Sequence, residues 1–409
     1  MNLKSFFYRY LSFTLAKVGV LVGRSAILIL SFHWLTPIEF AGLAASLSFV
    51  EITKAFSELG AESIIYSRMS SFDKPISHIV KKLIRARFLV SSAFSLLLLF
   101  IFGYVLSSNS WPLFLLPLLG SFQNSNIAFM QKERSYKKIL FLVLWTLFIS
   151  LASVVIAFLH EVKGNSLAIL MIAPEIFSMS LGVIFTNVAW KQVLNYPQKA
   201  GQILGLSRLR PYIFPSLAVS VIVIFYSRLD VLLVLPLLGV TAQADYSIGL
   251  RLVEPLFLIM SMASFTLLAE LGSYNTVNSR VISSRIMIKM NGYNFLFLFS
   301  FGLILAFAVY WIAKNILGLN NSALMVSFCL VLAIPIKLCN TFLSTLLQRA
   351  GLFNVVMKAA LITLFITFTI GFILGFYIGL AGIVLAAVAA EFFNFLYQRY
   401  MVNFMLKDK

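Results

Sequence analysis

Basic side chains occur inside long apolar stretches of this sequence, where ionisable residues are rare. A charged side chain at the centre of a membrane helix costs about 2.5–3.5 kcal/mol on insertion scales, so such residues are functional candidates. A guanidinium group can bind phosphate oxygens through two parallel hydrogen bonds, and an ammonium group acts as a point charge. The basic residues within the stretches are Lys17, Arg24, Lys54, Arg228, Arg251 and Lys337.

In the first half of the chain, the spacing of these residues places them on common helix faces. Arg24 follows Lys17 by seven residues, and Lys54 lies between Glu51 and Glu58 at spacings of three and four. Residues three, four or seven apart share one face of a helix. Such a polar face must point to a partner helix or to a watery cavity rather than to lipid. Lys17 differs, because its place near the end of a stretch lets the ammonium group reach the interface.

The second half of the chain carries similar polar faces. Glu254 follows Arg251 by three residues, and Lys337 is followed at helical spacing by Asn340 and Thr341. These faces also require a partner helix or a cavity.

Two interpretations of the buried cations follow from this pattern. In the first, the cations line a cavity and hold an anion. In the second, they form structural ion pairs, for which the sequence offers Arg251 with Glu254, and Lys54 with Glu51 and Glu58. Buried charges that are paired in this way satisfy each other without any ligand.

Carboxylates also occur beside expected helix breaks and next to other charges. Glu175 directly follows Pro174, and Asp230 lies two residues after Arg228. Proline frees a backbone carbonyl and can break a membrane helix, so a carboxylate there could bind a coupling H⁺ or Na⁺. A packed acid that shares a hydrogen bond is the alternative interpretation.

Apolar helices must position these side chains. Of 409 residues, 61% are hydrophobic and 11% are charged, whereas soluble domains average about 45–50% and about 25%. A membrane span takes about 20 apolar residues, so the composition predicts an all-α polytopic membrane protein. Apolar runs between charged or turn-rich breaks predict twelve spans, at 11–32, 40–66, 86–106, 111–131, 139–159, 166–190, 212–236, 244–270, 291–313, 322–347, 354–376 and 380–400.

The distribution of positive charge predicts the orientation of these spans. If both termini are cytoplasmic, the outer loops hold only Lys163 and Lys314, and most of the 32 Lys and Arg residues lie on inner loops and tails. Excess Lys and Arg on short cytoplasmic loops is the positive-inside pattern. The net charge of +18 therefore reflects membrane topology and attraction to anionic lipid, and it does not imply a nucleic-acid partner.

Signatures of an enzyme are missing from the sequence. The predicted outer loops are short, there is no Walker-type phosphate-binding loop, and the three histidines stand alone. Cys329 and Cys339 would lie about 15 Å apart on one helix, which is too far for a disulfide. We therefore expect no catalytic site, no metal site and no cofactor other than a coupling ion.

The two halves of the chain resemble each other. Residues 23–30 (GRSAILIL) align with residues 227–234 (SRLDVLLV), which places Arg24 on Arg228. At a slightly larger shift, Gln123 and Asn124 align with Asn340 and Thr341. With six spans per half in the same orientation, this suggests a parallel repeat, and we predict six-helix lobes at 1–205 and 206–409. Transporters of that design bind substrate near the midplane between the halves.

Four segments resemble a known transporter family. They are LTPIEFAGL (35–43), ELGAESIIYSR (58–68), QKERSYKK (131–138) and YIGLAGIVLAAVAAE (377–391). In this order and spacing they resemble the polysaccharide-repeat (O-antigen, Wzx-type) flippases of the multidrug/oligosaccharidyl-lipid/polysaccharide exporter superfamily. One departure is Ala41 between Phe40 and Gly42, where members commonly have Phe-Gly.

The resemblance implies a V-shaped pair of six-helix lobes around a central cavity in the bacterial cytoplasmic (inner) membrane. Such a protein moves an undecaprenyl-pyrophosphate-linked oligosaccharide repeat to the outer leaflet by alternating access. Its partners would be this substrate, membrane lipids and other polysaccharide-assembly proteins. The alternatives are a drug or cation exporter of the same superfamily and a membrane enzyme of polysaccharide assembly.

Under this interpretation the candidate site has two sets of residues. The cations expected to line the cavity and bind the pyrophosphate are Arg24, Lys54, Arg228, Arg251 and Lys337. The further polar or ion-coupling candidates are Glu51, Glu58, Asn124, Glu175, Asp230, Glu254, Asn340 and Thr341.

Overall fold

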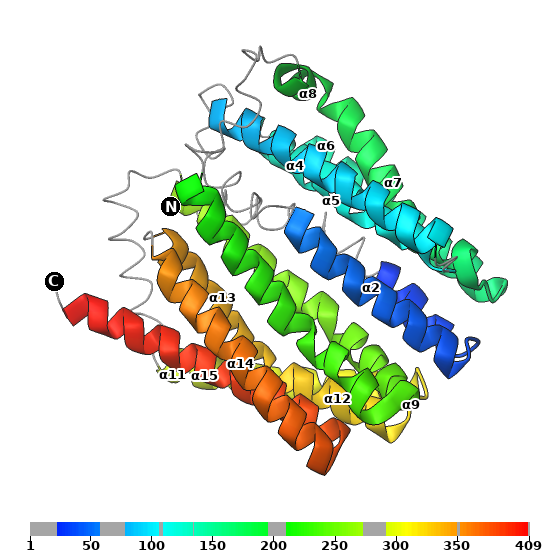
Figure 1. Ribbon diagram of the computed structural model, residues 1–409, viewed down its shortest axis with the longest axis vertical. Helices are drawn as coiled ribbons and strands as arrows, with labels where there is room; N and C mark the ends of the chain where they lie inside the picture. Colours follow the sequence, from blue (N-terminus) through cyan, green and yellow to red (C-terminus); the bar gives the residue numbers. More distant parts are fainter. Residues whose placement is uncertain are drawn as a thin grey trace. The chain divides into compact units, whose positions relative to one another are not determined.

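The chain is helical throughout the part that its computed structural model describes. That part comprises residues 23–57, 78–105, 109–133, 135–194, 210–272, 292–349 and 352–407, and it contains no β-strand (Figure 1). The predicted all-α fold class is confirmed.

The helices of the N-terminal half begin with a segment at residues 23–31. They continue with α2 (Pro37–Ser57), α4 (His78–Leu98), the π-helix η1 (Leu99–Val105), the 3-10 helix η2 (Trp111–Leu115), α5 (Leu116–Lys132), α6 (Tyr136–Leu159), α7 (Gly164–Phe185) and α8 (Asn187–Leu194). The C-terminal half contains α9 (Arg210–Gly272), α11 (Gly292–Asn315), α12 (Asn321–Leu332), α13 (Ile334–Arg349), α14 (Phe353–Ile378) and α15 (Leu380–Lys407). Each of the twelve predicted spans overlaps these helices where the chain is described, and α9 covers two of them.

Several of these helices have the length and composition of membrane spans. Among the described residues, 6 stretches are long and apolar enough to cross a membrane, or 7 if the bent pair α12–α13 is one span. Large apolar side chains lie on their outer surface, for example Leu151 on α6 and Phe365 on α14. Such a surface suits contact with lipid rather than with water. The chain is therefore a multi-pass membrane protein.

The start of α2 follows from local sequence. The Thr36 hydroxyl accepts a hydrogen bond from the Glu39 backbone N–H (3.3 Å), and the Glu39 carboxylate accepts from the Thr36 backbone N–H (2.9 Å). This reciprocal arrangement is a capping box, and Pro37 occupies the first helical position, where its missing N–H is tolerated. The helix thus begins at Pro37, three residues before the predicted span.

The long helix α9 is two antiparallel helices joined at Gly239. This glycine has φ +84° and ψ −174°, a backbone conformation open almost only to glycine. On a straight helix, Asp230 and Tyr246 would lie about 24 Å apart, yet the Tyr246 hydroxyl donates a hydrogen bond to the Asp230 carboxylate. The chain therefore folds back on itself here, as Figure 1 shows, and the separate spans predicted at 212–236 and 244–270 are confirmed.

Prolines act differently in α7 and α13. Pro174 lies inside α7, which continues through it to Phe185, so the helix break considered at this proline does not occur. Membrane helices tolerate proline where neighbouring groups satisfy the freed carbonyl. In contrast, α12 and α13 are bent by 42° at the break before Pro335. A Cβ on Gly302 of α11 would lie 2.6 Å from Cγ of Pro335, so glycine lets α11 approach the bend.

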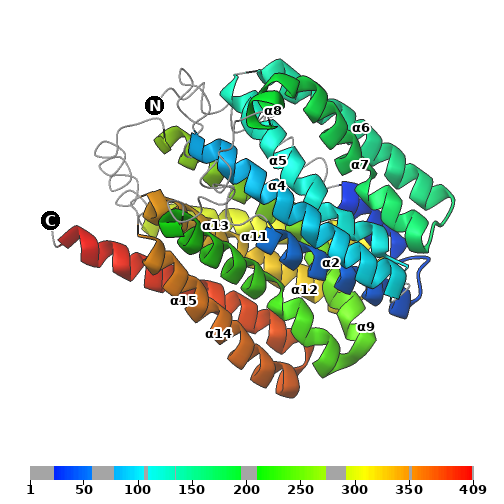
Figure 2. The same cartoon turned by 45° about the horizontal axis from the view of Figure 1, so that its top comes forward.

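Small residues allow α14 and α15 to pack closely. The two helices run side by side from the turn at Gly379 (Figures 1 and 2). A Cβ on Gly375 would lie 2.9 Å from Cγ1 of Ile383, and one on Gly371 would lie 3.4 Å from Cδ1 of Leu233. Gly375 therefore lets α14 approach α15, and Gly371 lets it approach α9.

The helix α4 begins earlier than the sequence predicted. It starts at His78 rather than near residue 86, so basic residues that we assigned to a loop lie within it. Lysine and arginine are good helix formers, so a run of them does not end a helix. Arg87 is only 1% exposed, so it is a buried charge that the sequence analysis did not count among the cations within the spans.

The chain divides into two compact units. Unit 1 comprises Met1–Ile27, Phe49–Val221 and Phe265–Ser273, and unit 2 comprises Leu28–Ser48, Ile222–Ser264 and Tyr274–Lys409. In unit 1, α7 packs against α5 and α6. In unit 2, a core of buried residues joins α9, α12 and α15. The lobe boundary near residue 205 stays a prediction.

Candidate functional site

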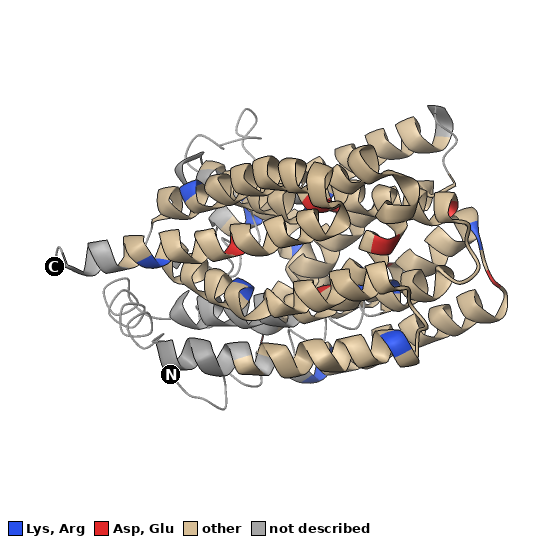
Figure 3. Ribbon diagram, turned by 90° about the horizontal axis from the view of Figure 1, so that it is seen from below, with Lys and Arg blue, Asp and Glu red and all other residues tan. Residues whose placement is uncertain are grey.

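Charged side chains are few along the described helices, as Figure 3 shows. Most of those predicted as site residues are in contact with an opposite charge. In unit 1, Arg24 on the segment 23–31 forms an ion pair with Glu175 on α7. Both side chains are mostly buried. The structure thus joins a predicted cation to an acid about 150 residues away in the sequence.

In unit 1, Lys54 of α2 lies against a glycine of α5. A Cβ on Gly120 would lie 2.5 Å from Cε and 2.8 Å from Nζ of Lys54. The lysine side chain therefore occupies space that any larger residue at position 120 would take. Glu51 lies one turn earlier on α2 and is half-buried. Glu58 lies outside the described residues.

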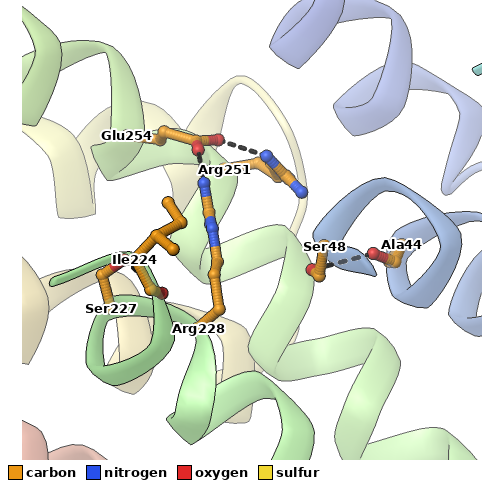
Figure 4. A network of polar contacts seen from close by, with 7 residues as sticks. All are labelled: Ala44, Ser48, Ile224, Ser227, Arg228, Arg251 and Glu254. Atoms are coloured by element: carbon orange, nitrogen blue, oxygen red, sulfur yellow. Dashed lines mark hydrogen bonds and ion pairs between the residues drawn. The ribbon is translucent and has the colours of Figure 1, made fainter. Parts of the chain in front are cut away.

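In unit 2, two arginines of α9 share one carboxylate. Arg228 precedes the turn at Gly239 and Arg251 follows it, and both donate to Glu254 (Figure 4). The side chains of Arg228, Arg251 and Glu254 are 10%, 3% and 10% exposed. The ion pair of Arg251 with Glu254, offered by the second interpretation, is present, and Arg228 is an additional partner. The cluster holds two cations and one anion.

Asp230 lies on α9 near this cluster in sequence but has other partners. Its carboxylate accepts a hydrogen bond from the Val231 backbone N–H (2.8 Å) and one from the Tyr246 hydroxyl. Asp230 is buried, and Tyr246 is fully buried. This is the geometry of a packed acid that shares hydrogen bonds.

Lys337 of α13 has an acidic and an aromatic neighbour. Its Nζ lies 3.4 Å from Oε1 of Glu391 on α15 and 4.2 Å from the ring centroid of Phe257 on α9. A cation over an aromatic face is attracted by the ring quadrupole. The lysine side chain is 26% exposed, so it is more accessible than the side chains of Arg228 and Arg251.

The two polar residues that follow Lys337 on α13 make different kinds of contact. Asn340 donates to the Glu391 backbone carbonyl (2.9 Å) and carboxylate (2.7 Å). The Thr341 hydroxyl donates to the Lys337 backbone carbonyl one turn earlier (2.7 Å), a contact within the helix. Asn340 thus joins α13 to α15, whereas the Thr341 hydroxyl stays with its own helix.

In unit 1, amide side chains of α5 make comparable contacts with α7. Asn124 is buried, and the neighbouring Gln123 donates to the Ser178 hydroxyl (3.3 Å). Asn126 accepts from the Thr186 hydroxyl (2.9 Å) and from the Trp190 indole N–H (2.7 Å). These bonds fix α5 against α7 and α8.

The sequence analysis missed three residues that contact the predicted cations, namely Glu391, Phe257 and Gly120. Glu391 could have been found from the repeat, because it follows Glu175 at almost the shift that relates Gln123 to Asn340. Phe257 and Gly120 give no such signal, since an aromatic residue and a glycine are ordinary in apolar helices. Among the described residues, no group of three His, Cys, Asp or Glu side chains could hold a metal ion.

Comparisons with known proteins identify the fold. No family model matches the chain, and no curated protein matches it. Solved structures do match, including the eukaryotic MATE transporter AtDTX14, with a TM-score of 0.68 and 14% identity over 98% of this chain and 95% of that one.

Two further solved structures give the same result. A mutant of the Vibrio cholerae MATE transporter VcmN has a TM-score of 0.68 and 13% identity over 99% of this chain and 97% of that one. An outward-facing multidrug resistance MATE family transporter of the MOP superfamily gives the same values. The chain therefore has the fold of the MATE transporters, an all-helical membrane fold with two lobes of six helices.

Proposed function

We propose that the protein is a flippase for an anionic, lipid-linked oligosaccharide. The substrate would be a sugar repeat carried on undecaprenyl pyrophosphate, such as an O-antigen unit. The protein would move it from the cytoplasmic to the outer leaflet by alternating access. The fold supports membrane transport, and the resemblance of the sequence to polysaccharide-repeat flippases supports the substrate class.

One observation carries this proposal, the cluster of Arg228, Arg251 and Glu254 in unit 2. Two guanidinium groups share one carboxylate within an apolar helical hairpin. Buried ions are costly unless they are paired and hydrogen-bonded, and here two guanidinium groups are held so that both contact the same oxygen-bearing anion. A pyrophosphate oxygen suits such a site, because guanidinium groups bind phosphate oxygens with charge-assisted hydrogen bonds.

Arg24, Lys54 and Lys337 would contribute to the same recognition. Under this proposal each supplies positive potential for anionic substrate within its own unit, while Glu175 and Glu391 hold the side chains of Arg24 and Lys337 in place. Glu51, Glu58, Asn124, Asn340 and Thr341 would contribute polar groups for the sugars or support for the cations. Glu175, Asp230 or Glu254 would serve coupling to H⁺ or Na⁺, and no other cofactor is proposed.

A deletion experiment tests the substrate class. In cells without the protein, the lipid-linked oligosaccharide should accumulate in the cytoplasmic leaflet and surface polysaccharide should be lost. Arg251→Ala at normal membrane abundance should restore less export than wild-type protein. Unchanged surface polysaccharide together with increased sensitivity to organic cations would favour a drug exporter, because two of the similar structures are named as multidrug resistance transporters.

The proposal includes the orientation of the chain in the membrane and the membrane in which it lies. We place the chain in the bacterial inner membrane with both termini cytoplasmic. In a background without Cys329 and Cys339, a cysteine at Asn109 should react with an impermeant thiol reagent from outside, and one at Lys138 should not. Both positions are exposed. Labelling at Lys138 in intact spheroplasts would contradict this orientation.

A further inference from the structure

One helix contact of unit 1 recurs in unit 2 with the cation on the opposite partner. In unit 1, Lys54 of α2 lies against Gly120 of α5. In unit 2, Lys337 of α13 lies over Phe257 of α9. In each unit the ammonium group lies between two corresponding helices. One contains the second predicted span of its half (α2, and the part of α9 after Gly239), and the other contains the fourth (α5 and α13).

The internal repeat relates these four residues to one another. Gly120 corresponds to Lys337 in the register that aligns Gln123 with Asn340. For the other partner, Leu47, Val50 and Glu51 of α2 align with Leu250, Val253 and Glu254 of α9, and this register places Lys54 on Phe257. It differs by one residue from the register that pairs Arg24 with Arg228, a difference that the intervening loops absorb.

Residue identity supports the register of α2 with α9, and burial agrees with it. Leu47 and Val50 are fully buried, and their counterparts Leu250 and Val253 are 5% and 0% exposed. At a shift larger by one residue, Leu47 and Val50 would align with Arg251 and Glu254, which are also buried, but the three identities would be lost. The identical residues therefore favour the alignment of Lys54 with Phe257.

A second set of contacts supports the register of α5 with α13. The amide of Gln123 donates to Ser178 on α7, and the amide of Asn340 donates to Glu391 on α15. The acceptors lie on the two corresponding helices at the end of each half. The two contacts of α5, with α2 and with α7, therefore recur in unit 2 as the contacts of α13 with α9 and with α15.

We infer that Lys54 and Lys337 are the two copies of one anion-contacting position, and that Gly120 and Phe257 are the positioning residues that set where each ammonium lies. Gly120 leaves room for the lysine to cross from α2 to the surface of α5. Phe257 attracts the lysine of α13 through its ring face. This inference rests on the proposed function, because it takes each ammonium group, within its own unit, to contact an anionic part of the substrate.

Exchanging the residues within unit 1 tests the inference. The double variant Lys54→Phe with Gly120→Lys rebuilds in unit 1 the arrangement of unit 2. Lys54→Phe alone removes the ammonium, and Gly120→Lys alone places a second ammonium beside the first. Each single variant should weaken binding of undecaprenyl pyrophosphate by purified protein roughly tenfold or more, and the double variant should regain most of this loss.

Milder variants separate positioning from folding. Gly120→Ala displaces only the flexible end of Lys54, so abundance in the membrane should be normal while binding falls severalfold. Gly42→Ala is the matched control, because nothing lies within 4 Å of a Cβ at that position. Phe257→Leu should weaken binding roughly two- to fivefold through loss of the cation–π contact, and Phe257→Tyr, which keeps the ring face, should preserve it.

The neutral lipid undecaprenol serves as the second probe. If wild-type protein binds undecaprenyl pyrophosphate no better than undecaprenol, the proposed function fails and this inference with it. If wild-type protein discriminates the two lipids but the double variant binds no better than the weaker single variant at equal abundance, only the duplicated position is overturned. Recovery by the double variant supports it, since a purely structural role of Lys54 gives no reason for an ammonium on α5 to restore binding.

Discussion

The arginines aligned by the internal repeat have different electrostatic settings in the two units. In unit 1, Arg24 pairs with Glu175 of α7, one cation with one anion. In unit 2, Arg228 shares Glu254 with Arg251, two cations with one anion. Equivalent positions in a repeat thus keep the cation and change its partner. The balance of charge around each arginine depends on where the acids lie.

This difference suggests that the arginine of unit 1 serves helix packing, whereas the arginines of unit 2 serve anion binding. The matched pair in unit 1 joins the first described helical segment to α7, so it holds helices together. The cluster in unit 2 is confined to the α9 hairpin and brings two guanidinium groups to one carboxylate. Under the proposed function, unit 2 supplies the stronger anion site, and unit 1 depends more on Lys54.

The largest effect is expected from charge reversal of the two arginines. Arg24→Glu places two carboxylates together in unit 1 and should destabilise the protein by about 3–5 kcal/mol or more. Arg228→Glu should cost less, because Arg251 still pairs with Glu254. Thermal unfolding of the detergent-purified variants measures this difference, and export should be lost in both.

Conservative substitutions provide the control for charge reversal. At each position we expect export to fall from Lys through Ala to Glu, with Lys retaining measurable activity. The same order is expected at Lys337 from wild type through Ala to Glu. Full export by Arg24→Glu and Lys337→Glu at normal abundance would show that these side chains are dispensable for recognition.

The second effect concerns removal of the acids. Glu254→Gln leaves two arginines side by side, whereas Glu175→Gln leaves one, so Glu254→Gln should destabilise more within the range of about 3–5 kcal/mol. Adding Arg251→Gln to Glu254→Gln should recover much of the loss, because the repulsion between guanidinium groups disappears. Equal melting temperatures for the two single variants would contradict the view that Glu254 compensates more positive charge than Glu175 does.

Pyrophosphate offers a direct measurement on the same variant. If an anion completes the cluster, inorganic pyrophosphate should raise the melting temperature of Glu254→Gln more than that of Glu175→Gln. The effect should weaken as the salt concentration rises, because salt screens charges in accessible sites.

Long apolar runs made most of the helices predictable from the sequence. The stretches at 139–159 and 354–376 agree closely with α6 and α14. The start of the span in α4 was predicted too late because Lys81, Lys82 and Arg85 were taken as loop residues, whereas α4 begins at His78. A run of basic residues therefore does not mark the end of a helix.

Contacts of the candidate site were predictable only at short range. Arg251 and Glu254 lie three residues apart on one helix, so their ion pair follows from helical geometry. Arg24 and Glu175 meet because two distant helices pack at a particular rotation, which no local spacing reveals. Gly120 was missed for a different reason, because its role is to leave space.

The amides of α5 and α13 give a third, smaller contrast. Asn340 donates to a carbonyl and to the Glu391 carboxylate, whereas Gln123 donates to the Ser178 hydroxyl at 3.3 Å. Bonds to charged groups contribute about 1.5–3 kcal/mol and neutral ones about 0.5–1.5 kcal/mol. Asn340→Ala should therefore destabilise more than Gln123→Ala in thermal unfolding, and the reverse order would contradict the assigned contacts.

The smallest effects are expected at glycines in turns. Gly239 in unit 2 has φ +84° with ψ −174°, and Gly164 in unit 1 has φ +59°. An alanine adopts the left-handed region at about 1–2 kcal/mol, while the region of Gly239 excludes side chains more strongly. Gly239→Ala should thus lower stability more than Gly164→Ala.

Space around these glycines isolates the backbone effect. A Cβ meets nothing within 4 Å at Gly239 and only ordinary contacts with Asn109 at Gly164. Gly42 in α2 has equally open surroundings without a positive φ, so Gly42→Ala should be neutral or stabilising by up to about 1 kcal/mol through helix propensity. If Gly239→Ala behaved like Gly42→Ala, the α9 hairpin would not depend on the glycine conformation, and another turn geometry would have to bring Arg228 to Glu254.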